Sequence, residues 1–345
     1  MQNKNFTLRI TVLILIFLII PVTFSIVSVP STIKLLVSAV CFLFIMYSVF
    51  VLLLFYKVKN QDKTFIQSHG ENILIIAPHQ DDCVALAGGY AVQTVEKGGQ
   101  VNILYTTDGY KDDKFTRKQE AIKAWSVLGD NSVSIEFLSY TNNQSFLSRY
   151  EIDEGINKIG EYLKKVKPET IFIPLYEGGH YQHDVTNYMV SKALDNQKLP
   201  CTVYESPIYN FFMSFNTTPE KILSGLVRFI PFVSYDYPPE PVRNDTVYYL
   251  KMTDEQLQKK KEIIVQFKTQ SPHKLVERWG FCDRYQKLHD YDYSQPPFDY
   301  SRSLACRIHR MKSWPLIGNI MRKVMIWTVT IHPDPDYTMT KIPFV

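Results

Sequence analysis

The chain has 345 residues, of which 46% are hydrophobic and 14% are aromatic, and its formal net charge is +4. This length and composition are sufficient for one sizeable globular domain and an additional element. The net positive charge is small, and the sequence contains no Lys/Arg block of the kind that marks nucleic-acid-binding tails. We therefore predict no nucleic-acid partner.

Two uncharged apolar runs near the start of the chain predict a transmembrane helical hairpin within residues 1–57. The runs span residues 10–29 and 35–56, and about 20 apolar residues are enough for a helix to cross the hydrocarbon core. Lys4 and Arg9 precede the first run as in a signal peptide, but the run lacks a small-residue cleavage site. Even if the first run were cleaved as a signal peptide, the second would stay in the membrane.

Positive charges near the two runs predict how the hairpin is oriented. They lie mainly outside the loop between the runs, at Lys4, Arg9, Lys57, Lys59 and Lys63, whereas the loop carries only Lys34. Because short cytoplasmic segments are enriched in Lys and Arg, both ends of the hairpin are predicted to be cytoplasmic. The domain that follows would then face the cytoplasm.

Residues 58–70 are polar and predict a linker, after which strand-like and helix-like patterns alternate. This alternation is typical of an α/β domain, here a Rossmann-like, mostly parallel sheet with helices on both faces. The predicted strands are residues 72–77, 101–106, 133–139, 170–175 and 202–205, and the predicted helices are residues 84–97, 116–128, 153–167 and 184–197. We assign residues 71–270 to a catalytic domain and residues 271–345 to an extension that packs on or near it.

Three loops that follow predicted strands hold clusters of polar residues. The clusters are His79, Asp81 and Asp82 after the first strand, Thr107, Asp108 and Gly109 after the second, and Gly179, His180 and His183 after the fourth. Right-handed crossovers bring the carboxyl ends of parallel strands to one edge of a sheet. Open α/β sheets bind ligands at that edge, so the clusters are expected to converge.

The first and last clusters each have a structural and a catalytic interpretation. Asp81 or Asp82 could cap the helix that follows, and His180 and His183 could be exposed loop residues. A His and an Asp three residues apart, with a second acid between them, can instead supply two metal ligands and leave one carboxylate as a base. One imidazole from each cluster and one carboxylate would make a three-ligand zinc site with an open position, as in catalytic sites.

Several motifs in the same order resemble those of the LmbE-like, or PIG-L-like, zinc-dependent N-acetylglucosaminyl deacetylases. The resemblance covers roughly residues 72–270. It is carried by Pro78-His79-Gln80-Asp81-Asp82-Cys83, by Thr107-Asp108-Gly109, by Arg117, Glu120, Leu128 and Gly129, by Gly179-His180-Tyr181-Gln182-His183, and by the lysine-rich residues 259–270.

The resemblance implies a zinc-dependent hydrolase that removes an acetyl group from an N-acetylated sugar or glycoconjugate. It implies that His79, Asp82 and His183 hold Zn²⁺, that Asp81 is the general base, and that His180 stabilises the oxyanion. The implied substrate is an N-acetylated sugar or a glycolipid. Because the predicted hairpin tethers the domain, we expect the substrate to be met at the membrane surface.

Two residues depart from the family pattern, because Gln80 replaces the usual proline and Cys83 replaces the usual glutamate. Cys83 could close the metal site as a fourth ligand, as in a catalytically silent carbohydrate-binding relative. We predict instead that Cys83 stays aside as a small apolar residue. A nucleotide-binding α/β protein is a weaker alternative, because Gly88-Gly89 lacks the Gly-x-Gly-x-x-Gly spacing.

Arg117 also has two interpretations. It could be a solvated helix charge that pairs with Glu120 three residues later, or it could reach the site from the helix after the second strand. The pattern alone slightly favours the surface pair.

Overall fold

The computed structural model describes residues 2–59, 64–110, 114–129, 131–142, 149–176, 181–208, 244, 246–270, 272 and 283–293. The chain forms two compact units, Met1–Asp62 and Lys63–Val345. The described part of the first unit is helical, and that of the second is an α/β unit built on one sheet.

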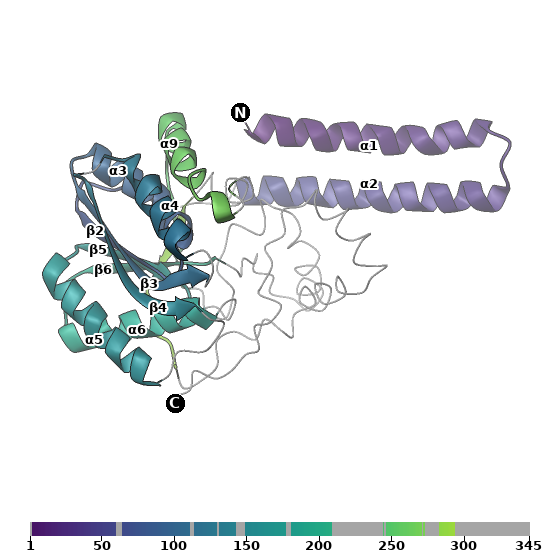
Figure 1. The fold of residues 1–345 in the computed structure, drawn as a ribbon. Helices are drawn as coiled ribbons and strands as arrows, with labels where there is room; N and C mark the ends of the chain where they lie inside the picture. Colours follow the sequence, from purple (N-terminus) through teal and green to yellow (C-terminus); the bar gives the residue numbers. More distant parts are fainter. Residues whose placement is uncertain are drawn as a thin grey trace. The chain divides into compact units, whose positions relative to one another are not determined.

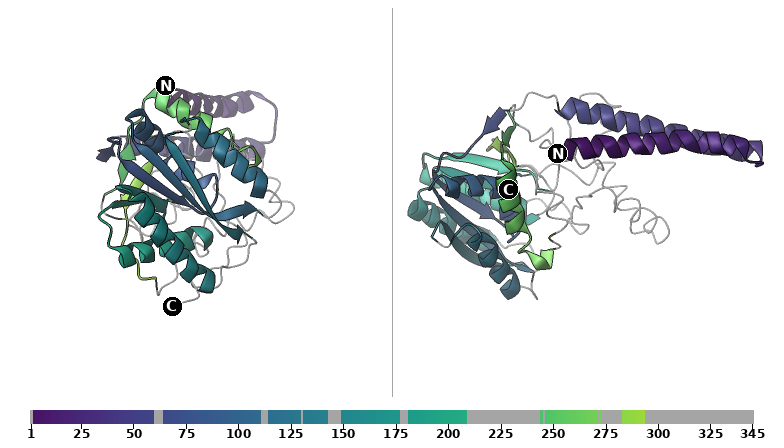
Figure 2. Two further views of the ribbon diagram at one scale, coloured as in Figure 1. Left: turned by 60° about the vertical axis from the view of Figure 1, so that its left-hand side comes forward. Right: turned by 90° about the horizontal axis from the view of Figure 1, so that it is seen from above.

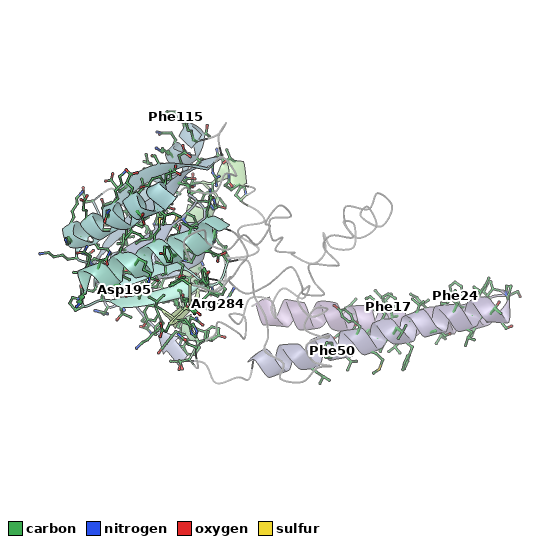
Figure 3. All side chains as sticks on the ribbon, turned by 90° about the horizontal axis from the view of Figure 1, so that it is seen from below. Phe17, Phe24, Phe50, Phe115, Asp195 and Arg284 are labelled. Carbon is green, nitrogen blue, oxygen red and sulfur yellow. The ribbon has the colours of Figure 1, made fainter. Side chains whose placement is uncertain are left out.

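The first unit is a pair of apolar helices, α1 (Gln2–Ile26) and α2 (Ser31–Lys59). At the start of α2, the Pro30 carbonyl accepts hydrogen bonds from the backbone N–H groups of Ile33 and Lys34. The helices contact each other through the stacked rings of Phe17 and Phe44, whose centroids are 3.8 Å apart. Figure 3 labels Phe17 on α1 and Phe50 on α2.

Apolar side chains cover the outside of this helix pair. On α2, Leu35, Leu36, Phe42 and Leu43 are between 61% and 73% exposed. Within the described residues one segment, Ser31–Phe50, is long and apolar enough to cross a membrane, and the apolar stretch of α1, Ile14–Ile26, is shorter. Helices therefore occupy both predicted apolar runs, and one segment meets the requirement for a span by length and composition.

The described part of the second unit contains an eight-stranded sheet with the spatial order β1-β7-β8-β6-β5-β2-β3-β4. The strands are β1 (Thr64–Ile66), β2 (Asn72–Ala77), β3 (Gln100–Tyr110), β4 (Val133–Asn142), β5 (Thr170–Pro174), β6 (Thr202–Ser206), β7 (Tyr248–Leu250) and β8 (Arg284–Lys287). β8 is antiparallel to β6 and β7, and the other pairs are parallel. The sheet is therefore mixed but mostly parallel.

Helices cover both faces of the sheet (Figures 1 and 2). One face carries α3 (Asp82–Glu96), α4 (Lys114–Ser126) and α9 (Asp254–Ile264), and the other carries α5 (Arg149–Val166) and α6 (Tyr181–Gln197). Because consecutive strand residues point to opposite faces, Ile73 and Ile75 of β2 pack under α3, whereas Leu74 and Ile76 pack under α6. Burial on both faces explains why β2 is continuously apolar.

The order of the strands reverses at β2. The chain adds β3 and β4 on one side of β2, then returns to add β5 and β6 on the other side. Open α/β sheets bind ligands outside the carboxyl ends of the strands where this reversal occurs. The turn after β2 lies next to the start of α6, the helix that follows β5.

The α/β class and the mostly parallel sheet agree with the sequence prediction, and the differences lie at the edges of the sheet. Residues 64–66, within the predicted linker, form β1 and pair with β7. Within the predicted extension, β8 lies between β7 and β6, and most of residues 271–345 lie outside the described residues. β3 and β4 run past their predicted ends because register shifts after Tyr105 and Thr107 let them stay paired.

A buried ion pair braces the helix that follows β2. At Ala87, φ is −153° and ψ is 29°, so α3 consists of two segments. The Asp283 carboxylate accepts hydrogen bonds from the N–H groups of Gly89, at 2.6 Å, and Tyr90, at 3.2 Å, which begin the second segment. Lys260 of α9 pairs with the other oxygen of Asp283, and both side chains are fully buried. This pair ties α3 to α9 and to the start of β8.

Candidate functional site

The turn between β2 and α3 presents two adjacent carboxylates that differ in their contacts. Asp81 occupies the N-cap position of α3, but its side chain makes no capping hydrogen bond. Asp82 begins the helix, and its Oδ2 accepts a hydrogen bond from the His79 backbone N–H at 3.1 Å. The capping interpretation therefore does not account for Asp81.

His79, Asp82 and His183 come together at the switch point of the sheet. One ligand atom of each residue lies within 4.8 Å of the others, and all three residues are buried. Asp82 Oδ2 is 2.8 Å from His79 Nδ1 and 3.1 Å from His183 Nε2. His183 belongs to the first turn of α6, which follows β5. The loops after two neighbouring strands thus supply this three-residue cluster.

The environment shifts the pKa values of the two acids in opposite directions. Burial raises the pKa of Asp81, the charge of Asp82 adds to that effect, and Arg117 and His79 oppose it. Burial also acts to raise the pKa of Asp82, but the charges and hydrogen bonds of His183 and His79 outweigh burial and lower it. Two acids whose pKa values are pushed apart can divide the work of binding and proton transfer.

The donor set of the cluster fits a zinc ion. Two imidazoles and one carboxylate form a three-ligand set that leaves a coordination position open. His79 Nε2 is 2.5 Å from Gln182 Oε1, and an amide oxygen only accepts hydrogen bonds. In the neutral form in which imidazoles bind metals, with the proton on Nε2, His79 would offer Nδ1 as a ligand atom beside Asp82 Oδ2.

Gln182 is a functional residue that the sequence argument missed. It is buried, and its contact with His79 fixes the ring from the side opposite the cluster. Outer contacts of this kind orient metal-binding imidazoles and raise their basicity. Its position in the sequence gives no signal of this contact, because His79 lies 103 residues earlier.

The second polar cluster braces the first. The backbone N–H and the hydroxyl of Thr107 both donate to the Pro78 carbonyl, at 3.2 Å and 2.7 Å. Gln80 Nε2 donates to the Thr107 carbonyl at 3.2 Å. Asp108 is buried, with Oδ2 4.0 Å from Lys114 Nζ, and is not part of the three-residue cluster. These contacts hold the two loops together.

Arg117 lies at the site and not on the surface. Its side chain is 7% exposed, and Nη2 donates to Asp81 Oδ1 at 3.2 Å. Glu120, the alternative partner, instead accepts hydrogen bonds from the backbone N–H and the hydroxyl of Thr269, at 2.9 Å and 2.7 Å. The surface interpretation of Arg117 was wrong because α4 turns this residue toward the loop after β2.

Cys83 points away from the three-residue cluster. Its thiol donates to the Gln80 carbonyl at 2.9 Å and lies 2.8 Å from the Tyr105 hydroxyl. The Trp125 indole N–H donates to its sulfur at 3.3 Å. Burial raises the pKa of Cys83 despite the hydrogen bonds from Tyr105 and Trp125, which favours the neutral thiol. A neutral thiol is a poor zinc ligand.

His180, the residue assigned to the oxyanion by resemblance, lies outside the described residues, as does Gly179.

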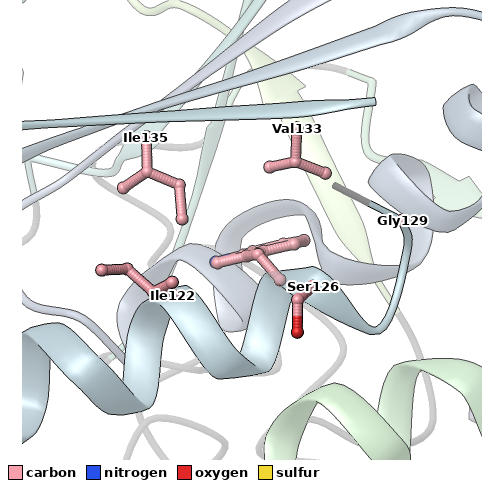
Figure 4. Close-up of a pocket in the computed structure, with 6 residues that line it drawn as sticks. Ile122, Ser126, Gly129, Val133 and Ile135 are labelled. Carbon is pink, nitrogen blue, oxygen red and sulfur yellow. The ribbon is translucent and has the colours of Figure 1, made fainter. Parts of the chain in front are cut away.

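A cavity of about 230 Å³ lies between α4 and the start of β4, lined by Ile122, Trp125, Ser126, Gly129, Val133 and Ile135 (Figure 4). This cavity borders the start of β4, whereas the three-residue cluster lies at the edge where the parallel strands end. The cavity is therefore separate from the cluster.

Residues 74–194 match the family model for PIG-L, described as GlcNAc-PI de-N-acetylase. The matched region begins in β2 and ends in α6, so it contains all three residues of the cluster. No match was found among the curated proteins.

Among solved structures, the chain is similar to N,N'-diacetylchitobiose deacetylase from Pyrococcus horikoshii, with 20% identity over 64% of this chain and 84% of that chain and a TM-score of 0.43. It is similar to the A40926 pseudoaglycone deacetylase Dbv21, with 16% identity over 59% and 83% of the two chains and a TM-score of 0.44. It is also similar to 4-carboxy-2-hydroxymuconate hydratase from Pseudomonas putida KT2440, with 14% identity over 64% and 97% of the chains and a TM-score of 0.41.

Proposed function

We propose that this chain, in which residues 74–194 are a PIG-L family domain, is a zinc-dependent hydrolase. Its reaction removes the acetyl group from an N-acetylated sugar or glycoconjugate. The observation that carries the proposal is the buried cluster of His79, Asp82 and His183 beside a separate acid, Asp81. A three-ligand metal set with a free carboxylate next to it is the arrangement that metal-assisted amide hydrolysis requires.

In this proposal each residue has a defined role. His79, Asp82 and His183 hold zinc, which when bound supplies Lewis-acid activation of the amide carbonyl and of water. Asp81 takes a proton from the attacking water and returns it to the leaving nitrogen as the C–N bond breaks. The products are acetate and the free amine of the sugar. His180 is assigned to the oxyanion by resemblance alone.

The first prediction is that the full chain, purified in detergent, carries about one zinc per molecule and releases acetate from N-acetylated sugars. His79→Ala and His183→Ala are expected to lower the zinc content, because each removes one of three ligands. His69→Ala is the matched control, since the side chain of His69 is 74% exposed. Metal analysis and an acetate-release screen are the measurements. Full zinc occupancy in both cluster variants would show that the ligands are misassigned.

A catalytically silent relative is the alternative, and it depends on Cys83 closing the metal site. The contacts of Cys83 with Tyr105 and Trp125 argue against a fourth ligand. We therefore predict that Cys83→Ser keeps acetate release within a few-fold of wild type, because serine retains a donor of similar size. Cobalt-substituted wild type is expected to lack a thiolate charge-transfer band. A variant that switches on an inactive protein would support the silent alternative.

We further propose that α1 and α2 anchor the chain as a two-span hairpin with both ends in the cytoplasm, so that the site meets a glycolipid at the membrane surface. The proposal is supported by the apolar segment Ser31–Phe50 and by the excess of Lys and Arg outside the hairpin loop. Protease treatment of intact spheroplasts should leave a C-terminal tag uncut until lysis. Loss of the tag before lysis would place the domain outside.

A further inference from the structure

Arg117 and Gln80 approach Asp81 from two different elements. Arg117 extends from α4, and its Nη2 donates to Asp81 Oδ1 at 3.2 Å, with the two side chains 7% and 14% exposed. Gln80 directly precedes Asp81 in the turn after β2 and is completely buried. A carboxylate held by a planar guanidinium takes its orientation from the plane of that group.

Gln80 is itself fixed at both its backbone and its side chain. Its carbonyl accepts hydrogen bonds from the Cys83 thiol at 2.9 Å and the Tyr105 hydroxyl at 3.1 Å. Its Nε2 donates to the Thr107 carbonyl at 3.2 Å, which directs the remaining polar atom, Oε1, toward Gly109. Gln80 is therefore a rigid support rather than a flexible polar side chain.

Gln80 and Arg117 both face the position that a side chain on residue 109 would occupy. A Cβ atom on residue 109 would lie 2.8 Å from Gln80 Oε1 and 3.2 Å from Arg117 Nε, and Gly109 has a φ of +81°. Among the residues that the structure describes, neither of these two buried atoms has a hydrogen-bond partner. One is an acceptor and the other a donor, and a buried polar atom left without a partner is destabilising.

We propose that Gln80 and Arg117 are positioning residues for Asp81: Gln80 Oε1 faces Arg117 Nε across Gly109 without bonding to it here, and in the zinc-loaded protein it accepts that N–H, so that the fixed guanidinium sets the orientation of the Asp81 carboxylate. The inference rests on the proposed function for its catalytic meaning. Gln80 stands where the resembling family has proline, which carries no side-chain acceptor, so this support belongs to the sequence in hand. Gly109 is required because any side chain there would separate the two groups.

Steady-state kinetics of the zinc-loaded full chain test the proposal. Gln80→Met keeps the size of the side chain but removes its acceptor, and Arg117→Lys keeps the charge but removes the planar fork. Both variants are expected to lower kcat by about 10–100-fold, in line with the effect of small misplacements of a catalytic group, with KM and zinc content unchanged. Lys123→Gln, at an exposed position on α4, is the matched control.

Chemical rescue separates positioning from a purely structural role. Arg117→Ala is expected to regain part of its kcat when guanidinium ion is added, whereas a structural defect would not respond. A rise in KM with unchanged kcat would assign Arg117 to substrate binding and overturn the proposal. Unchanged kcat in Gln80→Met would also overturn it.

Crystal structures of the zinc-bound wild type and of Gln80→Met give a readout that does not depend on turnover. We expect the Asp81 carboxylate to keep its contact with Arg117 in the wild type and to rotate away in the variant. If wild type releases no acetate from any sugar, the proposed function fails, and the orientation of Asp81 still decides the positioning role. An identical Asp81 conformation in both structures would overturn it.

Discussion

Replacing Asp81 by asparagine is expected to lower the turnover number by about 10²–10⁴-fold, the usual contribution of a general base, while the protein keeps its zinc. The reason is that Asp81 lies beside the cluster without belonging to it: its carboxylate accepts a hydrogen bond from Arg117, whereas Asp82 lies between His79 and His183. Asp82→Asn is therefore expected to lose both metal and turnover. Acetate release and metal analysis of the two variants measure this difference.

The control for Asp81→Asn is the same substitution at Asp195, a 73% exposed side chain on α6 that Figure 3 labels. Asp195→Asn should change neither rate nor zinc content. Near-normal turnover in Asp81→Asn would mean that another group takes the proton. Loss of zinc in Asp81→Asn would mean that the roles of the adjacent acids are exchanged.

Replacing Lys260 by methionine is expected to reduce the free energy of unfolding by about 3–5 kcal/mol, the usual cost of removing one partner of a buried ion pair. The variant leaves the Asp283 carboxylate charged in the core, where both side chains are fully buried. Asp283 also caps the second segment of α3. The first turn of that second segment should therefore loosen too. Urea denaturation monitored by circular dichroism gives the change in free energy.

Lys251→Met, at an exposed position before α9, is the matched control and should change the free energy of unfolding by less than about 0.5 kcal/mol. A loss below about 1 kcal/mol in Lys260→Met would show that the pair is not what braces α3.

The centre of the fold could be predicted from sequence because its signals are local and strong. The run from Ile73 to Ala77 is apolar and buried on both faces, which identifies a central strand from composition alone. The polar clusters after β2 and β5 were expected to converge because parallel strands end at one edge, whereas the choice of His79, Asp82 and His183 within them came from the family resemblance. The edge strand β1 and its neighbour β7 have three residues each, too few for a period-2 pattern to emerge.

The missed site residues depend on contacts that no local pattern contains. The spacing of Arg117 and Glu120 on α4 fits a surface pair, but each residue bonds to a different element, the loop after β2 and Thr269. Similarly, the position of Gln182 does not reveal that its oxygen meets the ring of His79, 103 residues earlier. Such pairings are set by how helices dock on the sheet, which the sequence specifies only through the whole core.

The same long separation imposes an order of events during synthesis. After His79, the ribosome must add 103 residues to reach Gln182 and one more to reach His183, which completes the cluster; this takes roughly 5–20 s at about 5–20 residues per second. In that interval the nascent chain offers only His79 and Asp82 of the cluster, and two ligands would hold a metal ion weakly. Under the proposed function, zinc would therefore be loaded late, after assembly of the sheet, and zinc supply is expected to limit the activity of finished molecules and not their yield.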